Sequence, residues 1–304
     1  MRALGVIGRI LIGAGIVILL FAAYQIWGTS LQEAHTQSTL RHAFVHQAKN
    51  DQLQAALNQA MSRDQLPSGP PVVAPTTAAP AAGEPVGEIR IPKIGINQIL
   101  VEGTNTEDLR KGPGHYSGTP LPGQSGNAGI AGHRTTYGHP FYNLDGVQVG
   151  DPIVVTTVQG VFVYDAERSE VVSPNDTTAL TNTSGATLTL TTCNPRFSAS
   201  SRLIVIAQLA HSRLFSGVAG AKSTTTPTPT AKATSNDLAG TSDGQILTAV
   251  LWGILVAGVG ILVLVLAHMF RRRRWLIWGL GLVVVLVLLY FFFAAITPLL
   301  PASL

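Results

Sequence analysis

The chain contains one cysteine, Cys193, which lies between two strand-like runs. Threonine and leucine alternate from Thr187 towards the cysteine, which is the period-two pattern of a half-buried strand. Asn194-Pro195 ends that pattern, and a second apolar, β-branched run begins at Arg202. If the two runs pair across a loop of about eight residues, the thiol lies near the guanidinium group. Because a nearby cation favours the thiolate, this spacing predicts a nucleophilic cysteine.

A thiolate that attacks a peptide carbonyl forms a thioacyl intermediate, and the leaving amine then needs a proton donor. The chain has eight histidines, and five of them lie in a helix-like segment, beyond the last predicted strand or in an apolar span. The remaining three are His115, His133 and His139. His133 follows a strand-like run and lies in a glycine-rich turn, so the sequence alone favours it without excluding the other two.

Two segments and their order resemble the signature of sortases, most closely the class E type of actinobacterial housekeeping enzymes. The first is Ala131–Gly138 with the following Pro140–Asp145, which looks like the segment that carries the sortase histidine. The second is Thr189–Phe197 with an arginine nine positions after the cysteine. The resemblance covers roughly Glu88 to Leu209.

The resemblance implies roles for five residues. Cys193 is the nucleophile, and His133 is the general acid and base. Arg202 stabilises the developing oxyanion or the substrate, because a guanidinium group can donate several hydrogen bonds. Thr192 and Tyr116 contact the substrate, and Tyr116 occupies the place of a class E tyrosine linked to a preference for LAxTG over LPxTG signals.

The residues themselves leave other interpretations open. A cysteine at a strand end can be an inert, buried hydrophobic residue. Arg202 can instead be a surface residue in an ion pair. Without the resemblance, the sequence favours this structural role over a catalytic one. Arg134 and Arg196 are alternative cations near the predicted site.

The implied activity is that of a membrane-anchored cysteine transpeptidase. It cleaves a sorting signal of the LPxTG or LAxTG type between threonine and glycine and transfers the protein to an amine. The expected partners are secreted proteins with a C-terminal sorting signal and, as acceptor, a peptidoglycan precursor or a pilin lysine. No cofactor and no metal are expected. Two alternatives remain: a non-catalytic surface adhesin or scaffold, and a hydrolytic cysteine endopeptidase (a cysteine protease).

Composition sets further limits. The chain of 304 residues has 46% hydrophobic residues and a formal net charge of +4. Arg271–Arg274 supply four positive charges, so the rest of the chain is balanced. Outside Arg271–Arg274 the sequence shows no basic stripe interspersed with aromatic residues that could stack on bases. The charge distribution therefore argues against a nucleic-acid partner.

Short β-type runs separated by glycine and proline predict an all-β sandwich or barrel. The resemblance narrows this fold class to the eight-stranded sortase-type β-barrel with short helices. Helical turns are expected at Thr106–Lys111 and Pro140–Leu144. The expected strands are Glu88–Ile91, Ile96–Val101, Gly129–Gly132, Ile153–Thr157, Val161–Glu167, Thr187–Cys193 and Leu203–Leu209.

Long apolar runs predict three transmembrane helices. Ile10–Trp27 is long enough to cross a bilayer, and a retained anchor is favoured over a cleaved signal peptide. Positively charged segments next to membrane spans tend to face the cytoplasm. Arg2 and Arg9 therefore predict a cytoplasmic N-terminus, Arg271–Arg274 predict a cytoplasmic C-terminal turn, and the β-domain then lies outside. The expected order is an anchor (1–28), a helical stalk (29–64), a Pro/Ala-rich linker (65–87), the catalytic barrel (88–212), a Thr/Pro-rich linker (213–245) and a membrane hairpin (246–297).

Overall fold

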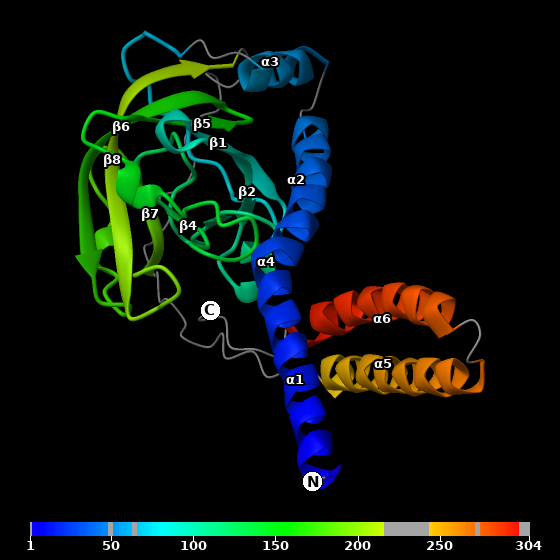
Figure 1. Ribbon diagram of the computed structural model, residues 1–304. Helices are drawn as coiled ribbons and strands as arrows, with labels where there is room; N and C mark the ends of the chain where they lie inside the picture. The colour runs from blue at the N-terminus through cyan, green and yellow to red at the C-terminus, as the bar shows by residue number, and fades with distance from the viewer. Residues whose placement is uncertain (1, 48–50, 63–65, 216–242, 271–273, 298–304) are drawn as a thin grey trace. The chain divides into compact units, whose positions relative to one another are not determined.

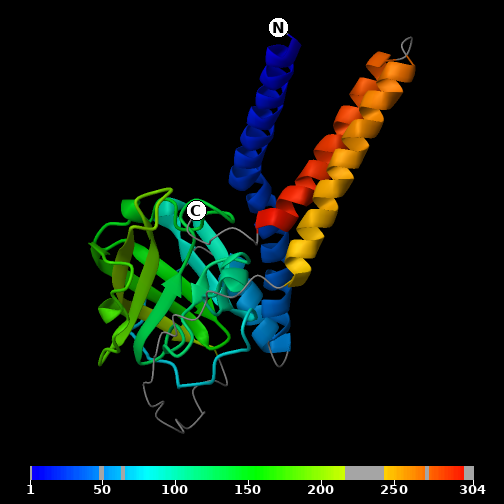
Figure 2. The same cartoon turned by 90° about the horizontal axis from the view of Figure 1, so that it is seen from below.

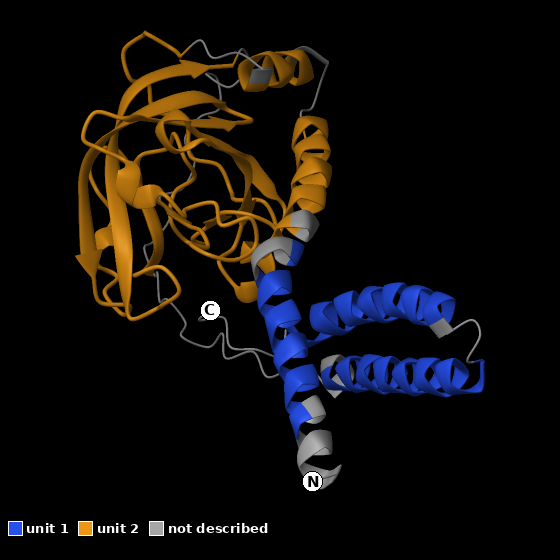
Figure 3. Cartoon of the chain, viewed as in Figure 1, with its two compact units in different colours: residues 1–28, 235–302 blue, residues 29–234, 303–304 orange. Residues whose placement is uncertain are grey.

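The computed structural model describes residues 2–47, 51–62, 66–215, 243–270 and 274–297. The chain divides into two compact units (Figure 3). One unit consists of residues 1–28 and 235–302, and the other of residues 29–234 and 303–304. The first unit holds long apolar helices, and the second holds a β-barrel with the helices that pack on it.

The second unit is built on a closed barrel in the order β1-β2-β3-β4-β7-β8-β6-β5 (Figure 1), so the predicted eight-stranded barrel is confirmed. Seen from below, the strands close around one interior (Figure 2). Neighbours are antiparallel except β2/β3 and β4/β7, which are parallel. The strands are β1 Pro85–Ile91, β2 Ile96–Glu102, β3 Gly114–His115, β4 Gly126–Ala131, β5 Pro152–Thr157, β6 Gly160–Val172, β7 Ala186–Asn194 and β8 Ser201–Leu214.

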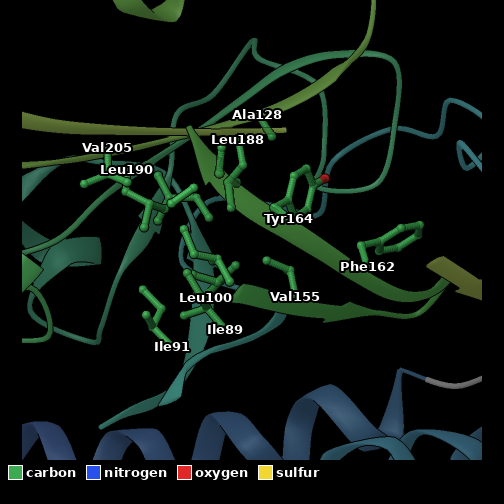
Figure 4. Packing of buried hydrophobic residues seen from close by; sticks show 14 of the residues in the cluster. Ile89, Ile91, Leu100, Ala128, Val155, Phe162, Tyr164, Leu188, Leu190 and Val205 are labelled. Atoms are coloured by element: carbon green, nitrogen blue, oxygen red, sulfur yellow. The ribbon is translucent and has the colours of Figure 1, made fainter. Parts of the chain in front are cut away.

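Alternating apolar residues fill the barrel interior, because successive side chains of a strand point to opposite faces. Figure 4 shows leucines of β7 meeting side chains from the facing strands. Each fully buried valine, leucine, isoleucine or phenylalanine side chain contributes roughly 1.5–3 kcal/mol of transfer free energy. The labelled members of this cluster are Ile89, Ile91, Leu100, Ala128, Val155, Phe162, Tyr164, Leu188, Leu190 and Val205.

Short helical turns connect the strands. The turn predicted at residues 106–111 is the helix α4, Thr106–Leu109, and the side chain of Asn105 accepts a hydrogen bond from the Asp108 backbone N–H at its start. Residues 140–143, where a helical turn is predicted, form hydrogen-bonded turns that lead into a 3₁₀ turn from Leu144. The 3₁₀ turns are η2 Pro92–Ile94, η3 Leu144–Gly146 and η4 Thr178–Leu180.

The segment expected as one helical stalk contains two helices, α2 (Thr29–His46) and α3 (Asp51–Ser62). Both pack on the outer face of the barrel, and Figure 1 shows α2 running beside β1 and β2. Phe44 and Leu57 are completely buried in this contact. The buried members of this outer cluster are Leu40, Phe44, Leu57, Ala60, Ile99, Val101, Val154, Val161, Val163 and Phe215.

The proline-rich segment between α3 and β1 is extended and lies against the barrel. The backbone N–H of Val72 donates to the Ser212 hydroxyl at 2.6 Å. Further along, the Ala74 N–H donates to the Gly123 carbonyl at 2.7 Å. Over its described residues this segment therefore has fixed partners on the barrel surface.

The first unit contains α1 (Arg2–Ala23), a π-helical turn η1 (Tyr24–Gly28), α5 (Asp243–Met269) and α6 (Arg274–Ile296). Two stretches, Ile246–Met269 and Trp275–Ile296, are long and apolar enough to cross a membrane. Within α1 the corresponding apolar stretch is shorter, Leu11–Ala23. Residues 271–273 of the predicted basic turn and residues 216–242 of the predicted Thr/Pro-rich linker lie outside the described residues.

Candidate active site

The pairing of β7 with β8 brings the cysteine and the arginine together. Cys193 and Arg202 are direct partners in this antiparallel pair. Directly opposite residues have Cβ atoms about 4.5–5.5 Å apart, and their side chains leave the sheet on the same face. The thiol and the guanidinium group therefore start from neighbouring positions at one end of the barrel.

The parallel pairing of β4 with β7 brings the segment that carries His133 to the same end of the barrel. Ala131 of β4 pairs with Thr191 of β7, and the Gly132 N–H donates to the Thr191 carbonyl at 3.0 Å. The Thr192 hydroxyl donates to the Gly132 carbonyl at 2.7 Å. His133 is the next residue, so it follows β4 at the end of the barrel where β7 carries Cys193.

Alternation along β7 sets the face on which the thiol lies. Leu188 and Leu190 point into the barrel core, so Thr189, Thr191 and Cys193 point outward. Cys193 is half-buried and is a free thiol. The thiol therefore lies on the outer face of the barrel, at the end of β7.

His133 carries an imidazole that is neutral at pH 7. Burial, and to a smaller extent the charge of Arg110, lowers the pKa of His133 to about 4. Its Nε2 atom is buried without a hydrogen-bond partner, and its ring centroid lies 5.2 Å from that of Tyr137. A neutral imidazole with an uncommitted nitrogen can accept the proton of a neighbouring thiol.

This lowered pKa predicts a pH dependence of stability. An unfolded chain takes up a proton at this histidine near its ordinary pKa of 6.5, whereas the folded chain does so only near 4. Stability is therefore present above pH 6.5 and is lost as the pH falls through that window, by on the order of 3 kcal/mol. Thermal unfolding of the wild type and His133→Gln at pH 7.5 and 4 measures this difference. Equal acid destabilisation of the two proteins would contradict it.

One guanidinium nitrogen of Arg202 forms hydrogen bonds with main-chain carbonyls where the loop after β7 joins β8. Its Nη1 donates to the carbonyls of Ala199 and Ser201, both at 3.1 Å. These bonds hold the head of the side chain near the strand end. A guanidinium group has five N–H donors, so others remain for an oxyanion.

Arg134 connects the histidine segment to the cysteine strand. Its side chain is buried, and its Nη1 donates to the Cys193 carbonyl at 3.2 Å and to the Asn194 Oδ1 at 2.6 Å. The Nη2 atom pairs with Asp145 at 3.2 Å. Arg134 therefore holds the main chain at Cys193, a positioning role that the sequence did not reveal because nothing local marks Asp145 as its partner.

Arg196, the other alternative cation, has its guanidinium group paired with Asp145 and packed on Tyr142. Its Nη2 donates to both carboxylate oxygens of Asp145, at 3.0 and 3.2 Å, and its Nε donates to the Tyr142 carbonyl. The guanidinium carbon lies 4.4 Å from the Tyr142 ring centroid. Of the three candidate arginines, only Arg202 is the direct strand partner of Cys193.

The two predicted substrate-contact residues lie on opposite faces of the strand. Thr192 is buried, and its hydroxyl is committed to the Gly132 carbonyl, which fixes the start of the histidine segment. The Tyr116 hydroxyl lies 3.1 Å from that of Thr191, on the face that carries the thiol. Substrate contact by either residue stays a prediction, and Tyr116 is the better placed of the two.

The other two candidate histidines have different surroundings. His115 is fully buried, with Nδ1 2.7 Å from the Glu102 carboxylate and Nε2 3.0 Å from the Pro120 carbonyl. His139 is exposed and packs against Tyr142. Both ring nitrogens of His115 have partners, whereas the Nε2 atom of His133 is buried without one, so His133 stays the favoured candidate for the acid/base residue. Within the described residues, no group of three or more His, Cys, Asp or Glu side chains could hold a metal ion.

The chain is similar in sequence to known proteins. Residues 89–210 match the family described as the sortase domain. The chain is 32% identical over 223 residues to Sortase SrtE1 of Streptomyces coelicolor, which covers 68% of this chain and 57% of that protein. It is 30% identical over 191 residues to Sortase D of Bacillus subtilis, covering 62% of this chain and 89% of that protein.

One similar solved structure is that of Sortase E1 from Streptomyces coelicolor with a tripeptide in the active site. It is 33% identical, with a TM-score of 0.42, and the match covers 45% of this chain and 94% of that one. This chain thus spans little more than half of full-length SrtE1 but most of Sortase D.

Proposed function

Because the chain belongs to the sortase family, we propose that it is a membrane-anchored cysteine transpeptidase. It cleaves an LPxTG or LAxTG sorting signal between threonine and glycine and transfers the protein to an amine. The observation that supports the proposal is that Arg202 is the strand partner of Cys193, while His133 comes two residues after Ala131, the last residue of β4 that pairs with β7.

The chemistry follows from these positions. His133 takes the thiol proton, and the Cys193 sulfur attacks the threonine carbonyl. Arg202 donates hydrogen bonds to the oxyanion that develops. The amide bond then breaks, the glycine amine leaves with the proton from His133, and the acyl group remains as a thioester. In the second half, an incoming amine attacks the thioester, gives its proton to His133 and releases the thiol.

The proposed location is the cell membrane, with the barrel on the outer side. Two apolar helices long enough to span a bilayer support anchoring. The arginines at the N-terminus and at Arg271–Arg274 favour the cytoplasm for both of these segments. This topology gives the barrel access to secreted proteins with a C-terminal sorting signal and to a cell-wall precursor amine or a pilin lysine.

The test uses the full chain in detergent with LAETG- and LPETG-type peptides, with and without a diglycine acceptor. We expect cleavage in both conditions and a new amide conjugate when the acceptor is present, and neither with Cys193→Ala. Equal cleavage by Cys193→Ala would end the proposal. Cleavage without any conjugate at high acceptor concentration would instead indicate a hydrolytic endopeptidase.

A further inference from the structure

The stalk helix α2 contacts the barrel through Gln37. The side-chain amide of Gln37 bonds to both the N–H and the carbonyl of one β2 residue, as a neighbouring strand would. The Gln37 Oε1 accepts from the Ile99 N–H at 2.6 Å, and its Nε2 donates to the Ile99 carbonyl at 3.0 Å. The same Nε2 donates to the Lys111 carbonyl at 2.8 Å. This one side chain therefore ties α2 to β2 and to the segment that follows α4.

One helical turn earlier, Glu33 lies on the same side of α2 and is 5% exposed. A Cβ atom added at Gly138 would overlap its carboxyl group, so this side chain packs directly on the Gly138 backbone. Gly138 has φ +70°, a conformation that favours glycine. The Glu33 Oε1 atom has no hydrogen-bond partner, and burial raises the pKa of Glu33 to about 7.

These two contacts reach both segments that surround the proposed acid/base residue. Gly138 belongs to the turn that carries His133, and its neighbour Tyr137 packs against the His133 ring. Lys111 follows Arg110, whose guanidinium carbon lies 5.5 Å from the Tyr137 ring centroid. The charge of Arg110 also contributes to the low pKa of His133.

We propose that α2 positions His133, with Glu33 and Gln37 as positioning residues, so that the stalk helix is part of the catalytic unit. The inference rests on the proposed role of His133 in transpeptidation. Apolar packing by residues such as Phe44 would be enough to dock the helix. Apolar docking of α2 would not require a buried carboxyl group with an oxygen that lacks a hydrogen bond. Burying such an oxygen costs desolvation free energy, and buried polar atoms without partners are uncommon in folded proteins.

The experiment compares Glu33→Ala, Gln37→Ala and Glu33→Gln in the full chain in detergent. Ser38→Ala and His42→Ala, at exposed positions of the same helix, are the matched controls. We expect kcat for the signal peptide to fall about tenfold in both alanine variants with KM within twofold, because a small displacement of an acid/base group is costly. Glu33→Gln keeps the shape and size of the side chain that packs on Gly138, so it should stay within twofold of the wild type.

Hydrogen exchange of residues 133–142 gives a second readout that needs no substrate. It should be faster in Glu33→Ala and Gln37→Ala and unchanged in the two controls. Wild-type kcat and exchange in both alanine variants would overturn the inference, and so would a Glu33→Gln defect equal to that of Glu33→Ala. If the wild type cleaves no signal peptide, the proposed function fails, while the exchange rates still decide whether α2 holds the turn.

Discussion

Replacement of His133 by glutamine is expected to lower kcat for signal cleavage by about 10²–10⁴-fold, the usual contribution of a positioned acid/base group. Glutamine fills a similar volume and keeps a hydrogen-bonding group at this position, but it cannot shuttle the proton. KM for the peptide should change little, because the imidazole acts on the transferred proton and does not bind the signal. Steady-state kinetics with a fluorogenic signal peptide measure both constants.

His139→Gln is the matched control, since His139 lies in the same turn segment and is exposed. Its kcat should stay within about twofold of the wild type, below the range of acid/base effects. A His133→Gln enzyme that retains wild-type kcat would remove His133 from the mechanism. A large loss in His139→Gln instead would assign the role to that residue.

Replacement of Arg202 by alanine is expected to lower kcat by about 10²–10³-fold, as the loss of an oxyanion donor does in acyl-transfer enzymes. Arg202→Lys should recover only part of this loss, because lysine keeps the charge but not the planar fork of donors. The guanidinium head also bonds to the Ala199 and Ser201 carbonyls, so the thermal stability of each variant is measured alongside kcat.

Arg168→Ala is the control for this series. Arg168 lies on β6 in an exposed ion pair with Glu170, so its removal changes the net charge without touching the site. The Arg168→Ala enzyme should behave as the wild type. If Arg202→Ala matched it in kcat, Arg202 would be a structural residue of the strand end.

The part of the site on β7 and β8 was predictable from the sequence. The threonine and leucine alternation before Cys193 predicted a strand with the leucines on one side, and Leu188 and Leu190 do lie in the core. The expectation that this strand is half-buried was wrong, because its threonines are buried as well. A single loop connects the two strands, so the distance along the chain constrained which residues pair. Cys193 opposite Arg202 follows from that local geometry.

The contacts that hold the site were not predictable, because they join segments far apart in the chain. Arg134 reaches Asn194 and Asp145 through folded geometry, and no local pattern marks these partners. Glu33 looks like a solvated residue in a helix pattern, yet the barrel covers it. Strand β3 has two residues, Gly114–His115, which is too short for alternation to be recognised.

The most direct test of the account is the mass of the enzyme during turnover. The full chain is mixed with a signal peptide in the absence of an amine acceptor, quenched in acid, digested and analysed by mass spectrometry. We expect an added mass equal to that of the N-terminal cleavage fragment less one water, carried by the peptide that contains Cys193 and absent from Cys193→Ala. Signal cleavage with the Cys193 peptide unmodified at every time point, or with the acyl group on another residue, would contradict it.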